Sequence, residues 1–127
     1  MDSIATFTAH TQQGSGRGTE ISIPTLNVQM EEVPSELDEG IYACLVTLSE
    51  DAQKLPAVMH YGPRPFFQDT PTCEIHVIDT EVTDPPISLT VDVVEHLREI
   101  SNFSSLDELK TQISADIDRA RAILSTQ

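Results

Sequence analysis

The sequence predicts a mainly β protein in which short strands close into a small barrel and one helix packs on the outside. Short apolar runs rich in β-branched residues recur between turns from the N-terminus to about residue 93, whereas a helical pattern occurs only near the C-terminus. The 127 residues contain no internal repeat and fit a single domain over 1–127. Strands followed by one helix favour a closed barrel over an all-helical or an alternating α/β fold.

Strands are expected where apolar or alternating residues lie between turn residues. The clearest one is 40–48, which is β-branched and aromatic and begins at a glycine. Pro24 interrupts the apolar segment 21–28 and indicates a strand start, an edge or a bulge there. Residues 88–93 alternate between apolar and polar side chains, which predicts a half-buried strand. The inward-facing residues of that strand are expected to be Leu89, Val91 and Val93. Further strands are expected at 1–10, 56–61 and 73–80.

A single helix is expected over residues 105–124. Ser105 and Glu108 have the spacing of a capping box, in which a hydroxyl and a carboxylate accept hydrogen bonds from free N–H groups at a helix start. Apolar residues then recur on one face at the helical period. They are Leu106, Leu109, Ile113, Ile117, Ala120 and Leu124.

The net charge of the chain limits the classes of partner that it can bind. A net charge of −14, with two lysines and five arginines, argues against a nucleic-acid partner and against an anionic membrane surface. No run approaches the roughly 20 apolar residues of a membrane helix, and the N-terminus lacks the basic and apolar regions of a signal peptide. A cytoplasmic protein is therefore expected. A bound divalent cation would offset repulsion of an anionic substrate.

The two cysteines, Cys44 and Cys73, lie in apolar runs that are expected to be strands. Their spacing matches neither a zinc site nor a CxxC redox motif. Two buried, reduced thiols are the expected outcome.

A glycine-rich segment is the first candidate site. In Gly14-Ser15-Gly16-Arg17-Gly18, backbone N–H groups could approach phosphate oxygens closely because glycine has no side chain in the way. The segment is neither a Walker A loop nor a dinucleotide-binding fingerprint. From composition alone, a plain hairpin loop is the favoured interpretation.

Thr25 and Asn27 form the second candidate site. They lie two residues apart in Pro24-Thr25-Leu26-Asn27, so both side chains face the same way if the segment is extended. A hydroxyl and an amide oxygen side by side can help to hold Mg²⁺, which prefers oxygen ligands and shares its shell with phosphates and water. The alternative is an ordinary turn beside a proline.

Glu74 is the third candidate. It lies in an otherwise apolar strand and shares a face with His76, opposite the face of Cys73, Ile75 and Val77. A carboxylate in that position could accept a proton from a hydroxyl nucleophile. The alternative is a solvated face without a chemical role. His60 and His96 are expected to be surface or packing residues, since the histidine spacing matches no metal motif.

In order and spacing, these segments resemble the riboflavin kinase (flavokinase) family, including the kinase part of bacterial bifunctional FAD synthetases. The resemblance runs from about His10 to Leu124. The glycine-rich loop and Pro-Thr-Leu-Asn at 24–27 are similar to the family's loop and Pro-Thr-Ala-Asn motif. Further similar segments are Gly40-Ile41-Tyr42-Ala43, Tyr61-Gly62-Pro63-Arg64-Pro65, Cys73-Glu74-Ile75-His76-Val77-Ile78-Asp79, Leu97-Arg98, Phe103-Ser104-Ser105-Leu106-Asp107-Glu108-Leu109, and Gln112-Ile113 with Asp116-Ile117 and Ala120.

The resemblance implies a six-stranded antiparallel, Greek-key-like barrel with a C-terminal helix. It implies transfer of the ATP γ-phosphate to the 5′-hydroxyl of riboflavin to give FMN, with Mg²⁺ or another divalent cation. Separately, a monomer is expected. Glu74 would be the general base, and Thr25 and Asn27 would bind the metal and phosphate oxygens. The remaining implied contacts are Gly14, Gly16, Arg17 and Gly18 with the nucleotide, and Arg98 and Phe103 with the flavin.

Several residues depart from the family pattern. Glu20 would repel ATP phosphates, and Ser22 replaces a glycine. The family usually has asparagine at His60, threonine at Phe66, and a glutamate in place of Ile100. Pro85 and Pro86 occupy the region of a lost Asp-Leu-Tyr-Gly turn.

Two functions therefore stay open from the sequence. Thr25, Asn27 and Glu74 favour an active kinase. The departures and the negative charge favour a diverged, catalytically weak relative that binds flavin or nucleotide or serves as an interaction module. The adenylylating module of the bifunctional enzymes is absent from the sequence, so FAD synthesis is not expected unless the chain is a fragment of a longer protein.

Overall fold

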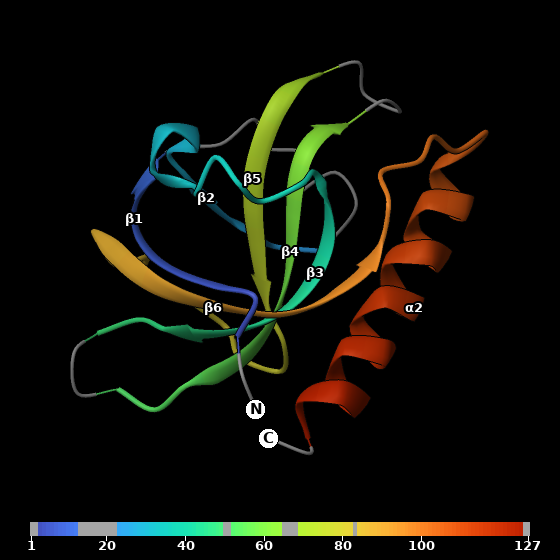
Figure 1. The fold of residues 1–127 in the computed structure, drawn as a ribbon. Helices are drawn as coiled ribbons and strands as arrows, with labels where there is room; N and C mark the ends of the chain where they lie inside the picture. The colour runs from blue at the N-terminus through green and yellow to red at the C-terminus, as the bar shows by residue number, and fades with distance from the viewer. Residues whose placement is uncertain (1–2, 13–22, 50–51, 65–68, 83, 126–127) are drawn as a thin grey trace.

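The described residues of the computed structural model, 3–12, 23–49, 52–64, 69–82 and 84–125, form a closed six-stranded barrel with one α-helix beside it (Figure 1). Every strand pair is antiparallel, and the order around the barrel is β1-β2-β5-β4-β3-β6, with β6 returning to β1. The elements are β1 (Ala5–Gln12), β2 (Leu26–Val28), the 3₁₀ helix η1 (Met30–Glu32), β3 (Gly40–Thr47), β4 (Leu55–Arg64), β5 (Asp69–Val77), β6 (Ser88–Arg98) and α2 (Leu106–Leu124). The predicted fold class is confirmed.

The barrel interior is filled by alternate residues of each strand. Met59 of β4, Ile75 of β5 and Val91 of β6 are completely buried there. Leu89 and Val93 lie in the same cluster, as the alternation of β6 predicted. Because side chains of a strand point to opposite faces in turn, this inward set leaves the intervening residues on the outer surface of the barrel.

Helix α2 covers part of that outer surface. Ala120 and Leu124 pack against outward-facing apolar residues of the barrel. The helix begins as expected: Ser105 Oγ accepts a hydrogen bond from the Glu108 N–H at 3.1 Å, and the Glu108 carboxylate accepts from the Ser104 N–H. No helix in the described part of the chain combines the length and apolar character needed to cross a membrane.

The pairing of β6 with β3 is irregular at two places near helix α2. The register shifts between Ile41 and Tyr42 and again between Ala43 and Cys44. A bulge adds a residue to one strand and redirects the side chains that follow it. As a result, the consecutive residues Leu97 and Arg98 both contact the helix side of the barrel: Leu97 packs in the cluster beneath α2, and Arg98 bonds a helix residue.

Both cysteines are buried and reduced, as predicted. Cys44 and Cys73 belong to the interior cluster. Burial raises the pKa of the Cys73 thiol to about 12, and it also raises the pKa of the Cys44 thiol well above its usual value. The thiolate form that reacts or binds metals is therefore disfavoured at both positions.

Gly62 in β4 provides a test of backbone strain. Its φ of +134° is disfavoured for residues with a side chain, and an added Cβ would lie 3.1 Å from the Glu39 Cβ. We expect Gly62→Ala to lower the free energy of unfolding by about 1–3 kcal/mol, measured by urea denaturation. Adding Glu39→Ala should restore only the part due to crowding by Cγ and Cδ of Glu39, which an added Cβ would meet at 3.3 Å. An unchanged unfolding free energy in the single variant would contradict a strained backbone at this position.

Candidate active site

The candidate residues lie in one row that runs across five strands. Asn27 of β2 is paired with Glu74 of β5, and Glu74 is paired on its other side with His60 of β4. Ile41 of β3 is paired with both His60 and Arg98 of β6. The row lies on the outer face of the barrel, because the neighbours of Glu74 in sequence, Cys73 and Ile75, fill the interior. Strand pairing thus places residues from distant parts of the sequence side by side.

Glu74 has a fixed and buried carboxylate and is second from the β2 end of this row. The residue is 2% exposed. Thr25 Oγ1 donates to Oε1 at 3.1 Å, and Thr72 Oγ1 donates to Oε2 at 2.9 Å. A carboxylate has several acceptor positions, and the two hydroxyl donors fix its orientation. The arrangement suits a group that must take a proton from a hydroxyl held at a defined place.

The segment that enters β2 is anchored beside Glu74. Pro24 O accepts a hydrogen bond from Nδ1 of His76 at 2.8 Å, so this ring nitrogen carries a proton. Thr25 follows immediately, and Asn27 lies in β2 opposite Glu74. The structure therefore brings the predicted Thr25–Asn27 pair and the predicted base together, in agreement with the spacing argument.

The residues expected to contact nucleotide phosphates fall only partly in the described chain. Gly14, Gly16, Arg17 and Gly18 lie outside the described residues, as do the departures at Glu20, Ser22 and Phe66. The last residue of β1, Gln12, is paired with Asn27. The described part of β1 therefore ends beside Asn27.

The β2 end of the row carries oxygen atoms that could bind a metal ion but, among its described residues, no cluster of strong metal ligands. In the part of the chain that the structure describes, no group of three His, Cys, Asp or Glu side chains is arranged to hold a metal ion. The Thr25 hydroxyl, the Asn27 amide and the Glu74 carboxylate are oxygen groups of the kind Mg²⁺ takes. This set fits a Mg²⁺ ion that is held jointly with substrate phosphates better than a permanently bound metal.

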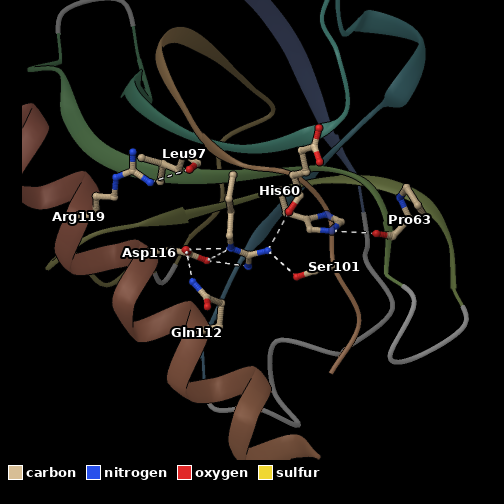
Figure 2. Close-up of polar contacts among 9 residues, drawn as sticks. His60, Pro63, Leu97, Ser101, Gln112, Asp116 and Arg119 are labelled. Atoms are coloured by element: carbon tan, nitrogen blue, oxygen red, sulfur yellow. Dashed lines mark hydrogen bonds and ion pairs between the residues drawn. The ribbon is translucent and has the colours of Figure 1, made fainter. Parts of the chain in front are cut away.

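The other end of the row adjoins an open pocket at the start of α2. The pocket has a volume of about 400 Å³ and is lined by Phe103, Asp107, Glu108, Thr111 and Gln112. Arg98 lies with its guanidinium carbon 5.8 Å from the centre of the Phe103 ring. In Figure 2, Asp116 and Gln112 project from the helix towards the end of β6 and Ser101. The two residues expected near a flavin are thus adjacent.

A sequence profile decides the family. The profile described as "Flavokinase: Riboflavin kinase" matches residues 3–124. The chain belongs to the riboflavin kinase family. The predicted relationship is thereby confirmed over nearly the whole chain.

Curated relatives of this riboflavin kinase family member include single-function and bifunctional proteins. The bifunctional riboflavin kinase/FMN adenylyltransferase of Pseudomonas fluorescens is 35% identical over 112 residues, covering 87% of this chain and 35% of the relative. The riboflavin kinase of Homo sapiens is 32% identical over 116 residues, covering 86% of this chain and 74% of the relative. The chain therefore spans about a third of the bifunctional protein and about three quarters of the human protein.

Solved structures share the barrel fold. A riboflavin kinase from Trypanosoma brucei superimposes with a TM-score of 0.63 at 19% identity, over 94% of this chain and 79% of the other. A protein from Streptococcus pneumoniae described as a macrolide-efflux protein gives a TM-score of 0.76 at 23% identity, over 91% of this chain and 38% of the other. At these identities the likeness concerns the fold.

Two residues that build the site, Thr72 and Asp116, were not predicted from the sequence. Thr72 was given no role, although it lies two residues from Glu74 on the same strand face, where the period of two would have placed it. Asp116 was also given no role. It lies three residues after Ile113 and four before Ala120, so a polar residue inside the apolar stripe was the available signal.

The departures that can be placed lie in the middle of the row, beneath α2 and beside β1. His60, where the family usually has asparagine, lies in the row next to Glu74, and its Nε2 donates to Pro63 O at 3.1 Å. Ile100 is partly buried against the cluster beneath α2. Pro86 O accepts a hydrogen bond from the Thr11 hydroxyl, while Pro85 is exposed.

Proposed function

We propose that this chain is a riboflavin kinase, which transfers the γ-phosphoryl group of ATP to the 5′-hydroxyl of riboflavin and releases FMN and ADP. The observation that carries the proposal is the buried Glu74 carboxylate, held through both oxygens by Thr25 and Thr72 and paired across the strands with Asn27. Family membership makes riboflavin and ATP the substrates to test.

Glu74 is the general base in this proposal. The 5′-oxygen forms a bond to the γ-phosphorus while the bond to the β,γ-bridging oxygen of ATP breaks, and ADP leaves with that oxygen. The proton of the 5′-hydroxyl passes to Glu74. Phosphoryl transfer depends mainly on alignment and charge neutralisation, so a base fixed by two hydroxyls is well suited to orient the nucleophile. The two threonines keep the carboxylate from rotating away.

Thr25 and Asn27 serve the phosphate end of the site. Their oxygen atoms, together with Gly14, Gly16, Arg17 and Gly18, would hold Mg²⁺ and the phosphate oxygens of ATP. The bound cation would neutralise phosphate charge, which matters in a chain with a net charge of −14. Metal and nucleotide therefore belong on the β2 side of Glu74.

The flavin belongs on the opposite side, towards Arg98 and Phe103. Glu74 and Arg98 are three strand spacings apart along the row, or roughly 14 Å on the barrel surface. Six bonds separate the flavin ring from the 5′-oxygen, and they span about 7 Å, which is the length of two extended residues. The ring system would span the remaining distance to Arg98. Riboflavin laid along the row would thus reach from Glu74 to the pocket beside Phe103.

The direct test is incubation of the purified chain with riboflavin, ATP and MgCl₂, followed by chromatographic separation of FMN from riboflavin with fluorescence detection. FMN should accumulate in proportion to the protein and require both ATP and Mg²⁺. Absence of FMN, with quenching of riboflavin fluorescence when the protein is added, would instead support the alternative of a diverged binding module.

A further inference from the structure

The guanidinium group of Arg98 is held by the protein through all three of its nitrogens. Nε donates to Oδ1 and Oδ2 of Asp116 at 3.0 and 3.1 Å, and Nη2 donates to Oδ2 at 2.8 Å. Nη1 donates to the Glu99 carbonyl at 3.1 Å and to Ser101 Oγ at 3.3 Å. The guanidinium group bonds the Asp116 carboxylate on one side and the loop after β6 on the other. These contacts fix both its plane and its direction.

Asp116 is the buried member of this arrangement. It is 5% exposed, and Gln112, one helical turn earlier, donates Nε2–H to its Oδ1 at 3.0 Å (Figure 2). Desolvation offsets much of the attraction in a buried ion pair, so such a pair need not add net stability. Its definite consequence is geometric, because the orientations of Arg98 and Gln112 both depend on one carboxylate.

The Asp116 carboxylate does not line the pocket, but it is connected to residues that do. Phe103 and Gln112 line the pocket, whereas Asp116 is not among its lining residues. Phe103 lies against Arg98, and Gln112 bonds Asp116 directly. Asp116 therefore bonds one lining residue, Gln112, directly and reaches a second, Phe103, through Arg98.

We infer that Asp116 is a positioning residue for the flavin end of the site, acting through Arg98 and Gln112. The inference rests on the proposed function, because it assigns riboflavin to the pocket. Loss of the Asp116 charge should loosen the segment 99–105 and weaken riboflavin binding. ATP binding and the transfer step should change little, because Glu74 and Thr25 lie at the other end of the row.

The test compares Asp116→Asn with Asp118→Asn. Asp118 lies on the same helix, has a side chain 76% exposed, and bonds Arg121 at 2.9 Å, so it is a matched carboxylate without a link to the pocket. Riboflavin binding is measured by fluorescence quenching without ATP. We expect the Kd for riboflavin to rise about tenfold or more in Asp116→Asn and less than about twofold in Asp118→Asn, with the KM for ATP unchanged in both. Unchanged riboflavin binding in Asp116→Asn would overturn the inference.

Two further measurements separate positioning from folding and from the proposed function. The double variant Arg98→Met with Asp116→Leu replaces the pair by apolar groups and should keep its melting temperature. Normal riboflavin binding by this variant would show the pair to be merely structural. Amide hydrogen exchange of 99–105 should accelerate in Asp116→Asn, and no acceleration would count against the inference. Wild-type protein that binds riboflavin but forms no FMN would defeat only the proposed function, whereas failure to bind riboflavin would defeat both.

Discussion

Glu74→Gln is expected to lower the rate of FMN formation at least about tenfold while riboflavin still binds, because general-base assistance is typically worth about 10²–10⁴-fold. The amide keeps the shape of the side chain but cannot accept the proton of the 5′-hydroxyl. It can still accept one of the two bonds that Thr25 and Thr72 donate to the carboxylate, so the strand should remain in place. The rate is measured by chromatography with saturating ATP and Mg²⁺, and binding by riboflavin fluorescence.

A suitable control for this variant is Glu81→Gln, which changes an exposed glutamate just after the end of β5. It removes the same charge from the same protein without altering the row, so its rate should match the wild type. If Glu74→Gln also retained the wild-type rate, Glu74 would have no role as the base, and its burial would have to be explained by packing alone.

Thr25→Ala and Asn27→Ala are each expected to raise the Mg²⁺ concentration needed for half-maximal rate, by about tenfold for loss of about 1.4 kcal/mol of binding. The two variants should differ at saturating Mg²⁺. Thr25→Ala also removes the hydrogen bond to Glu74 Oε1, so its maximal rate should stay low. Asn27→Ala should recover most of its maximal rate. Rates are measured across a series of MgCl₂ concentrations at fixed ATP.

Thr8→Ala provides the matched control for the hydroxyl. Its Oγ1 lies 3.0 Å from that of Thr90, on the β1–β6 pair and outside the row of site residues. It should show the wild-type Mg²⁺ dependence. An identical Mg²⁺ response in Thr25→Ala, Asn27→Ala and wild type would remove both residues from the metal site.

Much of the site's composition could be predicted because local patterns encode it. The period of two placed Glu74 and His76 on one face of a strand, and the spacing of Thr25 and Asn27 placed them together on another. Confirmation of the family over residues 3–124 follows from the same motifs. Assignment of Glu74, Thr25 and Asn27 to catalysis and metal binding stays a prediction until the variants are measured.

The sequence could not predict which strands would be neighbours. Glu74 meets Asn27 on one side and His60 on the other only because β5 pairs with both β2 and β4, which are separated by β3 in the chain. Non-local pairing depends on the whole barrel closing, and no window of sequence contains that information. The role of His60 as a neighbour of the candidate base was invisible for this reason.

The sequence by itself determined the elements of this protein: the strand alternation, the capped C-terminal helix, the buried thiols and the motifs of its family. Those features depend on the period of side-chain directions and on hydrogen bonds between near neighbours. Only the tertiary structure decided that Asp116 would face Arg98 across the junction of α2 and β6. A charged residue in an apolar stripe becomes meaningful once its partner is known, and the β6 bulges that turn Arg98 towards the helix form only in the closed barrel.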